Sequence, residues 1–88
     1  MITRSEMIPT RTHRPHAVTR GVMTLVQETR FEIENERGGR RLFVLAHDAP
    51  LEPADLQALL ADETLVRVEH SEADGLIAAV AHDVRPVR

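Results

Sequence analysis

The chain lacks several residue types on which common protein functions depend. Its 88 residues include no cysteine, tryptophan or tyrosine, and its eleven basic residues are all arginine. The absence of cysteine excludes disulfide bonds, thiol catalysis and thiolate metal sites. No apolar run approaches the roughly 18 residues of a membrane-spanning helix, and the N-terminus has no apolar stretch typical of a signal peptide. We therefore expect a cytoplasmic protein that makes no membrane contact.

The motifs of common catalytic sites are absent as well. The sequence contains no phosphate-binding loop, no dinucleotide-binding fingerprint and no serine nucleophile motif. Its only serines, Ser5 and Ser71, stand outside any such context. The acidic residues of the strand-like segments alternate with apolar ones, as on a solvated face. We therefore expect a protein that is not an enzyme and that needs no cofactor.

Charge divides the chain into two parts. The net charge is −3, but residues 1–20 carry four arginines and one glutamate (+3), whereas residues 21–88 carry seven arginines and thirteen acids (−6). Pro9 and Pro15, with no apolar period between them, predict a flexible basic tail over residues 1–16. Such an arm can dock on an acidic partner or on nucleic acid. The acidic remainder would repel a phosphate backbone unless its arginines are clustered.

Residues 17–88 have the composition and patterning of one small β domain. Hydrophobic residues make up 42% of the chain, enough for a core. Five segments rich in β-branched or alternating apolar residues predict strands at 17–27, 30–34, 41–47, 64–71 and 76–84. A proline start, an early acid and leucines spaced by three and four predict a helix at about 53–61. Gly21, inside the first strand, predicts a bulge or a sharp bend.

This order of elements predicts a mainly β fold, a small five-stranded barrel with a helix between its third and fourth strands. It is the order of the OB-fold. An SH3-like barrel is the alternative, although that fold usually has a single-turn helix late in the chain. In an OB-like barrel the third and fifth strands are parallel neighbours.

Four segments resemble the cold-shock domain family over about residues 17–86. They are Gly21-Val22-Met23-Thr24-Leu25-Val26, Arg30-Phe31-Glu32-Ile33, Leu42-Phe43-Val44-Leu45-Ala46-His47 and the Asp74-Gly75 turn. The resemblance implies an OB-like barrel that binds single-stranded nucleic acid by stacking bases on aromatic side chains. Phe31 alternates with Ile33 and is expected in the core, so Phe43 would be the stacking residue. Arg30, Arg41 and the basic tail would supply the contacts to phosphate.

The third and fifth strands are apolar on both faces, and this carries our leading hypothesis. One face fills the barrel, and the other needs a cover, since contiguous exposed apolar surface usually marks an interface. We assign Phe43, Leu45, Ile77 and Ala79 to that interaction face. The helix or the N-terminal segment is one possible cover. Otherwise a protein partner or a second copy of the chain covers it, and the protein is a binding or adaptor module.

Two His-Asp dipeptides suggest a further alternative. His47-Asp48 and His82-Asp83 lie at the ends of the third and fifth strands, where parallel pairing would bring them together. Imidazole and carboxylate groups can bind zinc or a similar metal. A metal site also needs three or four ligands and a supporting shell of hydrogen bonds. His47 and His82 are therefore the candidate ligands of a small metal-binding protein.

Overall fold

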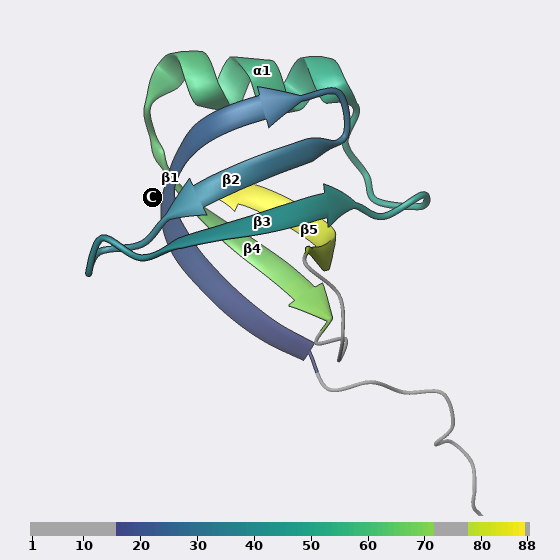
Figure 1. The fold of residues 1–88 in the computed structure, drawn as a ribbon. Helices are drawn as coiled ribbons and strands as arrows, with labels where there is room; N and C mark the ends of the chain where they lie inside the picture. The colour runs from purple at the N-terminus through teal and green to yellow at the C-terminus, as the bar shows by residue number, and fades with distance from the viewer. Residues whose placement is uncertain (1–15, 72–77, 88) are drawn as a thin grey trace, which may run out of the picture.

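A computed structural model describes residues 16–71 and 78–87 as a closed five-stranded barrel with one helix (Figure 1). The elements are β1 (His16–Gln27), β2 (Arg30–Glu34), β3 (Arg40–Leu45), α1 (Pro53–Asp62), β4 (Leu65–Ser71) and β5 (Ala79–Pro86). The strands follow one another around the barrel in the order β1-β2-β3-β5-β4, and β4 pairs with β1 to close it. This confirms the mainly β class and the position of the helix, and it fits a small OB-like barrel.

Strand β1 serves both halves of the barrel because it bends. Its first half, up to Val22, pairs with β4, and its second half, from Val22, pairs with β2. At Gly21 the backbones of β1 and β2 come so close that a Cβ atom would lie 2.3 Å from the carbonyl oxygen of Glu34. Gly21 thus lies next to Val22, where β1 changes its partner from β4 to β2. The register shift itself lies further along, between Met23 and Leu25.

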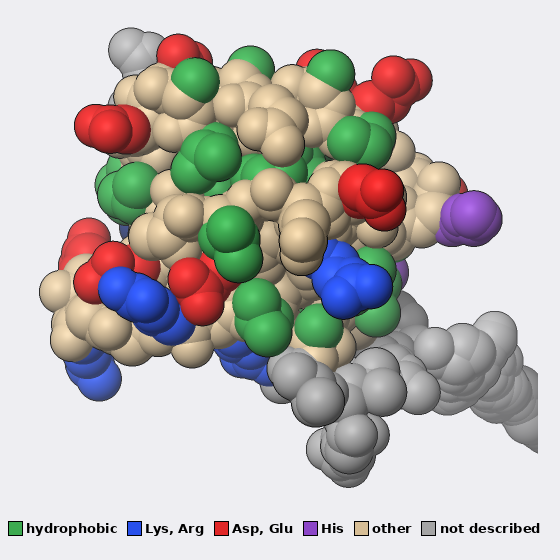
Figure 2. Space-filling view, turned by 45° about the horizontal axis from the view of Figure 1, so that its top comes forward, with side chains coloured by type: hydrophobic (Ala, Val, Ile, Leu, Met, Phe, Trp, Pro, Cys, Tyr) green, Lys and Arg blue, Asp and Glu red, His purple; other side chains and the backbone are tan. Residues whose placement is uncertain are grey.

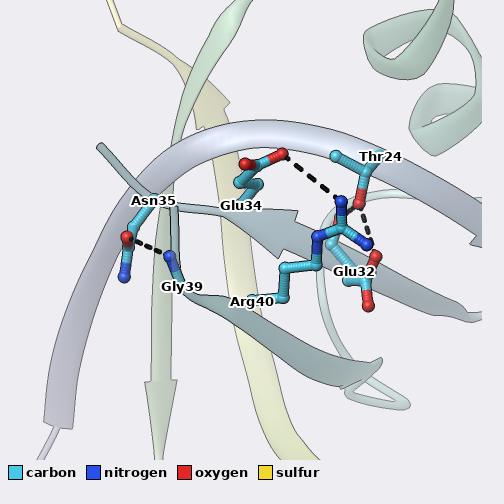
Figure 3. A network of polar contacts seen from close by, with 6 residues as sticks. All are labelled: Thr24, Glu32, Glu34, Asn35, Gly39 and Arg40. Atoms are coloured by element: carbon cyan, nitrogen blue, oxygen red, sulfur yellow. Dashed lines mark hydrogen bonds and ion pairs between the residues drawn. The ribbon is translucent and has the colours of Figure 1, made fainter. Parts of the chain in front are cut away.

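The hairpin between β2 and β3 is held by one side chain. The Asn35 Oδ1 accepts hydrogen bonds from the backbone N–H groups of Arg37 and Gly39, both at 2.9 Å. Figure 3 shows the bond from Gly39. Gly38 has a φ of 87°, a conformation that glycine adopts at little cost. The Gly38 N–H donates to the Asn35 carbonyl oxygen at 2.9 Å across Glu36 and Arg37, and the loop fixes the register Glu34↔Arg40.

The barrel interior is filled by alternate residues of each strand. Phe31 and Phe43 stack with ring centroids 5.3 Å apart, and the buried His70 ring meets Phe43 edge-on at 5.0 Å. The Nε2 atom of His70 lies 2.9 Å from the Thr19 hydroxyl. Helix α1 lies across one end of the barrel and buries Leu56 and Leu59 there (Figure 1).

Several boundaries differ from the expected ones. Strand β3 ends at Leu45 rather than at His47, because His47 and Asp48 form a turn. Strand β5 runs to Pro86, while the expected start of the fifth strand at residues 76–77 lies outside the described residues. The N-terminal residues 1–15 and the Asp-Gly turn near residue 74 lie outside them too. No helix among the described residues has the length and apolar character to cross a membrane.

Candidate protein-binding groove

Strands β3 and β5 are parallel neighbours, as the sequence predicted. Phe43 is level with Ala79, Val44 with Val80, and Leu45 with Ala81. Because side chains alternate along a strand, this register divides the apolar residues into one set that points into the barrel and one that points out. The candidate site depends on which set points outward.

The assignment of the interaction face to Phe43, Leu45 and Ala79 was wrong. These side chains are 0%, 7% and 5% exposed and belong to the core. The physical reason is the β2–β3 register: Phe43 is directly opposite Phe31, which fills the barrel, so every second residue of β3 follows it inward. Ile77, the fourth residue of that set, lies outside the described residues.

The outward set is Leu42, Val44 and Val80. Val44 and Val80 form the floor of a groove between the outer face of β3–β5 and the segment that leads into α1. The groove is lined by Thr29, Val44, Leu45, Ala46, His47, Leu51, Glu52, Pro53 and Val80. Most of its accessible lining is apolar. We call it the β3–β5 groove. A groove thus borders the outer face of β3 and β5, but its outward-pointing strand residues are Val44 and Val80, and of the predicted residues that the structure describes only Leu45 lines it.

The α1 side of the groove carries one acidic residue, Glu52, in an acidic stretch of the sequence. Between Arg41 and Arg67 the chain has no basic residue other than His47, and it has five acidic ones: Asp48, Glu52, Asp55, Asp62 and Glu63. Glu52 lines the groove directly, and its backbone N–H donates to the Asp55 carboxylate at 2.8 Å. Hydrophobic side chains gather where α1 meets the strands, and in that view the basic side chains lie over the strands, away from the helix (Figure 2).

The three predicted nucleic-acid contacts do not form a stacking site. Phe43 is buried, so its role as a stacking platform was wrong. The guanidinium carbon of Arg41 lies 5.8 Å from the Phe43 ring centroid, a cation–π distance. Arg30 is exposed and lies beside Val44 on the outer face. Nucleic-acid binding stays a prediction that rests on arginines alone.

The outer face of β2 carries carboxylates that would oppose a phosphate backbone. Glu32 Oε1 accepts a hydrogen bond from the Thr24 hydroxyl at 2.7 Å, and Glu34 Oε1 lies 4.0 Å from an Arg40 nitrogen (Figure 3). Arg40 and Glu34 are also directly opposite each other in the strand register. This face therefore has carboxylates and guanidinium groups in balance rather than a basic strip.

The two candidate metal ligands have different surroundings. His47 is exposed in the turn after β3, whereas the half-buried His82 has its Nε2 hydrogen-bonded to the Ser71 hydroxyl. Within residues 16–71 and 78–87, no three His, Cys, Asp or Glu side chains come together as a metal site would require. Metal binding through His47 and His82 stays a prediction.

The contact between Ser71 and His82 escaped the sequence interpretation. The β4–β5 register shifts between Glu69 and His70, which leaves His82 as the extra residue of a bulge on β5. A bulge reorients its side chain, and here it brings the imidazole to the hydroxyl of the neighbouring strand. A hydroxyl–imidazole contact is one part of a nucleophilic site. It is also an ordinary hydrogen bond between strands, and nothing in the sequence linked Ser71 to His82 across the ten residues between them.

Comparison with known proteins adds no family to these observations. The chain matches no protein-family model, no curated protein and no solved structure. The resemblance to cold-shock domains therefore stays a prediction, and the candidate site stands on its geometry.

Proposed function

We propose that this protein is a non-catalytic binding module that takes up an apolar side chain of a partner protein in the β3–β5 groove. The observation that carries the proposal is the groove itself. Val44 and Val80 point outward side by side, and Ala46, Leu51 and Pro53 extend the apolar lining. Concave apolar surface of this kind is the usual place for an anchoring side chain.

The charges around the groove narrow the kind of partner. Glu52 lines the groove on its α1 side and Asp55 lies beside it, whereas Arg30 lies beside Val44 on the β2 side. The carboxylates on the α1 side favour a basic residue next to the anchor on that side, because complementary charge steers encounter and rejects acidic segments. The partner is therefore a protein segment with one exposed apolar side chain flanked by arginine or lysine.

Selection of peptides from a random displayed library tests this function. The full chain is immobilised, and the selected peptides should share an apolar anchor with a basic neighbour. Binding should be lost in a Val44→Asp variant, since a carboxylate on the groove floor would be desolvated by the anchor. Leu25→Asp is the matched control: Leu25 is an exposed apolar residue on β1, 51% exposed, that does not line the groove.

The residues before β1 are a competing occupant, because the chain's own N-terminal segment could cover the groove. A variant without residues 1–15 should then bind the selected peptides more tightly than the full chain. Peptides that bind Val44→Asp as well as wild type, or whose NMR shifts map away from Val44 and Val80, would refute the proposed function.

A further inference from the structure

Three arginines form a row across the outer face of β1, β4 and β5. Arg20 is directly opposite Arg67 in the β1–β4 register, and Arg67 is directly opposite Arg85 in the β4–β5 register. Their neighbours Gly21, Val66, Val68 and Val84 are buried, so the three arginines point outward. Like charges directly opposite each other on a sheet are destabilising, and three in a row is an arrangement that needs a counter-charge.

A second row of the opposite sign lies beside the first. It consists of the residues two positions away from the arginines on each strand. Glu69 of β4 is directly opposite Asp83 of β5, and the exposed Val18 of β1 is directly opposite Glu69. We call the two rows together the charge band: an arginine row of Arg20, Arg67 and Arg85, and an acid row of Glu69 and Asp83. The rows are about 6.6 Å apart, the distance between alternate residues of a strand.

Contacts within the chain neutralise the band only in part. Arg85 Nε donates to the Asp83 carboxylate at 2.5 Å, whereas the nearest atoms of Arg67 and Glu69 are 3.9 Å apart, with side chains 38% and 39% exposed. Arg20 is exposed, and no ion pair forms between it and the rest of the described chain. The centre of the band, on β4, therefore holds charges that are only loosely paired.

The pattern is complementary to itself. A two-fold axis that runs between the rows and parallel to them places the arginine row of one copy on the acid row of the other. Arg67 then faces the partner subunit's Glu69, Arg85 faces the partner subunit's Asp83, and each contact occurs twice, as an isologous interface requires. Arg20 lies against the partner subunit's Val18, where the aliphatic part of arginine can pack. We propose that a second copy of this chain docks on the charge band.

Two observations favour a second copy over a nucleic-acid backbone. The acid row lies beside the arginine row and would repel phosphates, and residues 21–88 carry a net charge of −6. At the β1 end of the band, Val18 and Arg20 border a hollow that Asn35, Glu36 and Arg37 of the β2–β3 hairpin also line. Contact therefore centres on β4, which lies between β1 and β5 (Figure 1). An interface made of such exposed pairs is weak and sensitive to salt.

Charge reversal at the centre of the band tests the proposal. Sedimentation of the full chain should show self-association at about 0.02 M salt that weakens about tenfold or more at about 0.5 M salt. Arg67→Glu and Glu69→Arg should each be monomeric, because each places like charges face to face. A one-to-one mixture of the two variants should associate, and the double variant Arg67→Glu/Glu69→Arg should recover wild-type association.

The controls separate this interface from other surfaces. Arg40→Glu reverses an arginine on another face and should leave association unchanged, as should Val44→Asp in the β3–β5 groove. Association of the mixed variants also shows that both are folded. A wild type that is monomeric at low salt, a reversal without effect, or an unassociated mixture would overturn the proposal. Salt-sensitive binding of a monomer to an oligonucleotide, lost in Arg67→Glu, would overturn it in favour of a nucleic-acid site.

Discussion

Replacement of Gly21 by alanine is the most direct test of how the barrel closes. An added Cβ atom would lie 2.3 Å from the Glu34 carbonyl oxygen and 2.6 Å from the Ile33 Cγ2 atom, whereas ordinary contacts begin near 3.4 Å. The closest atom belongs to the backbone, so no change of rotamer can relieve the overlap. The two strands must separate by about 1.1 Å (3.4 minus 2.3) to accept the methyl group.

That separation is large on the scale of a hydrogen bond. A ladder bond of about 2.9 Å would lengthen to about 4.0 Å, which is beyond hydrogen-bonding range. The loss of two or three such bonds beside the Val22–Glu34 pair would cost about 2–3 kcal/mol. Alanine would recover about 0.5–1 kcal/mol, because glycine loses more chain entropy on folding. We expect the free energy of unfolding to fall by about 1–2.5 kcal/mol, which lowers Tm by about 4–20 °C in a domain of this size.

Far-UV circular dichroism in urea and on heating measures this change without relying on tryptophan, which the chain lacks. Gly39→Ala is the matched control, because the nearest atom to its Cβ is the Asn35 Nδ2 at 3.2 Å, so a shift of about 0.2 Å (3.4 minus 3.2) restores ordinary contact, against 1.1 Å at Gly21. A shift of that size leaves the hydrogen bonds of the Asn35 Oδ1 within range. The control should stay within about 0.5 kcal/mol of wild type. If Gly21→Ala were as stable as Gly39→Ala, the close approach of β1 and β2 would not explain the glycine.

Three further substitutions test the helix and the core. Asp55→Ala removes the carboxylate that accepts the Glu52 N–H at the start of α1, and it should lower the free energy of unfolding by about 1 kcal/mol in urea titration. His70→Ala empties a fully buried ring site against Phe43, and it should cost about 2–4 kcal/mol. Thr19→Val removes only the hydroxyl that meets His70 and should cost about 1 kcal/mol. Equal costs at His70 and Thr19 would mean that the hydrogen bond, and not the packing, gives His70 its importance.

The order of the strands was readable because local signals were strong and agreed. The alternation of Phe31 and Ile33 with charged residues, the adjacent glycines before β3, and the proline at the start of α1 each marked one element. The observed boundaries differ from the predicted ones where tertiary contacts determine the end of an element. At His47, for example, the chain turns because the pairing of β3 with β5 ends at Leu45.

The inward face of β3 could not be read from β3 alone, because the strand is apolar on both sides. The deciding information lay in the hairpin: Glu34 is level with Arg40, so Phe43 is level with Phe31 and must follow it into the core. Had the β2–β3 register been worked out first, it would have assigned Phe43 and Leu45 to the core and Leu42 and Val44 to the outer face. The charge band was still harder to predict, because it depends on the pairing of Arg20 with Arg67. These residues are directly opposite each other in the barrel but far apart in the sequence.

The bend in β1 also bears on how the chain folds. The second half of β1 meets β2 across a two-residue turn, but its first half meets β4, between 43 positions later (Val22 to Leu65) and 55 positions later (His16 to Ser71). Contacts between near residues form early, and contacts over long loops wait for the cost of loop closure to be met. One strand thus takes part in both an early and a late step of folding, and Gly21 lies where the two steps meet.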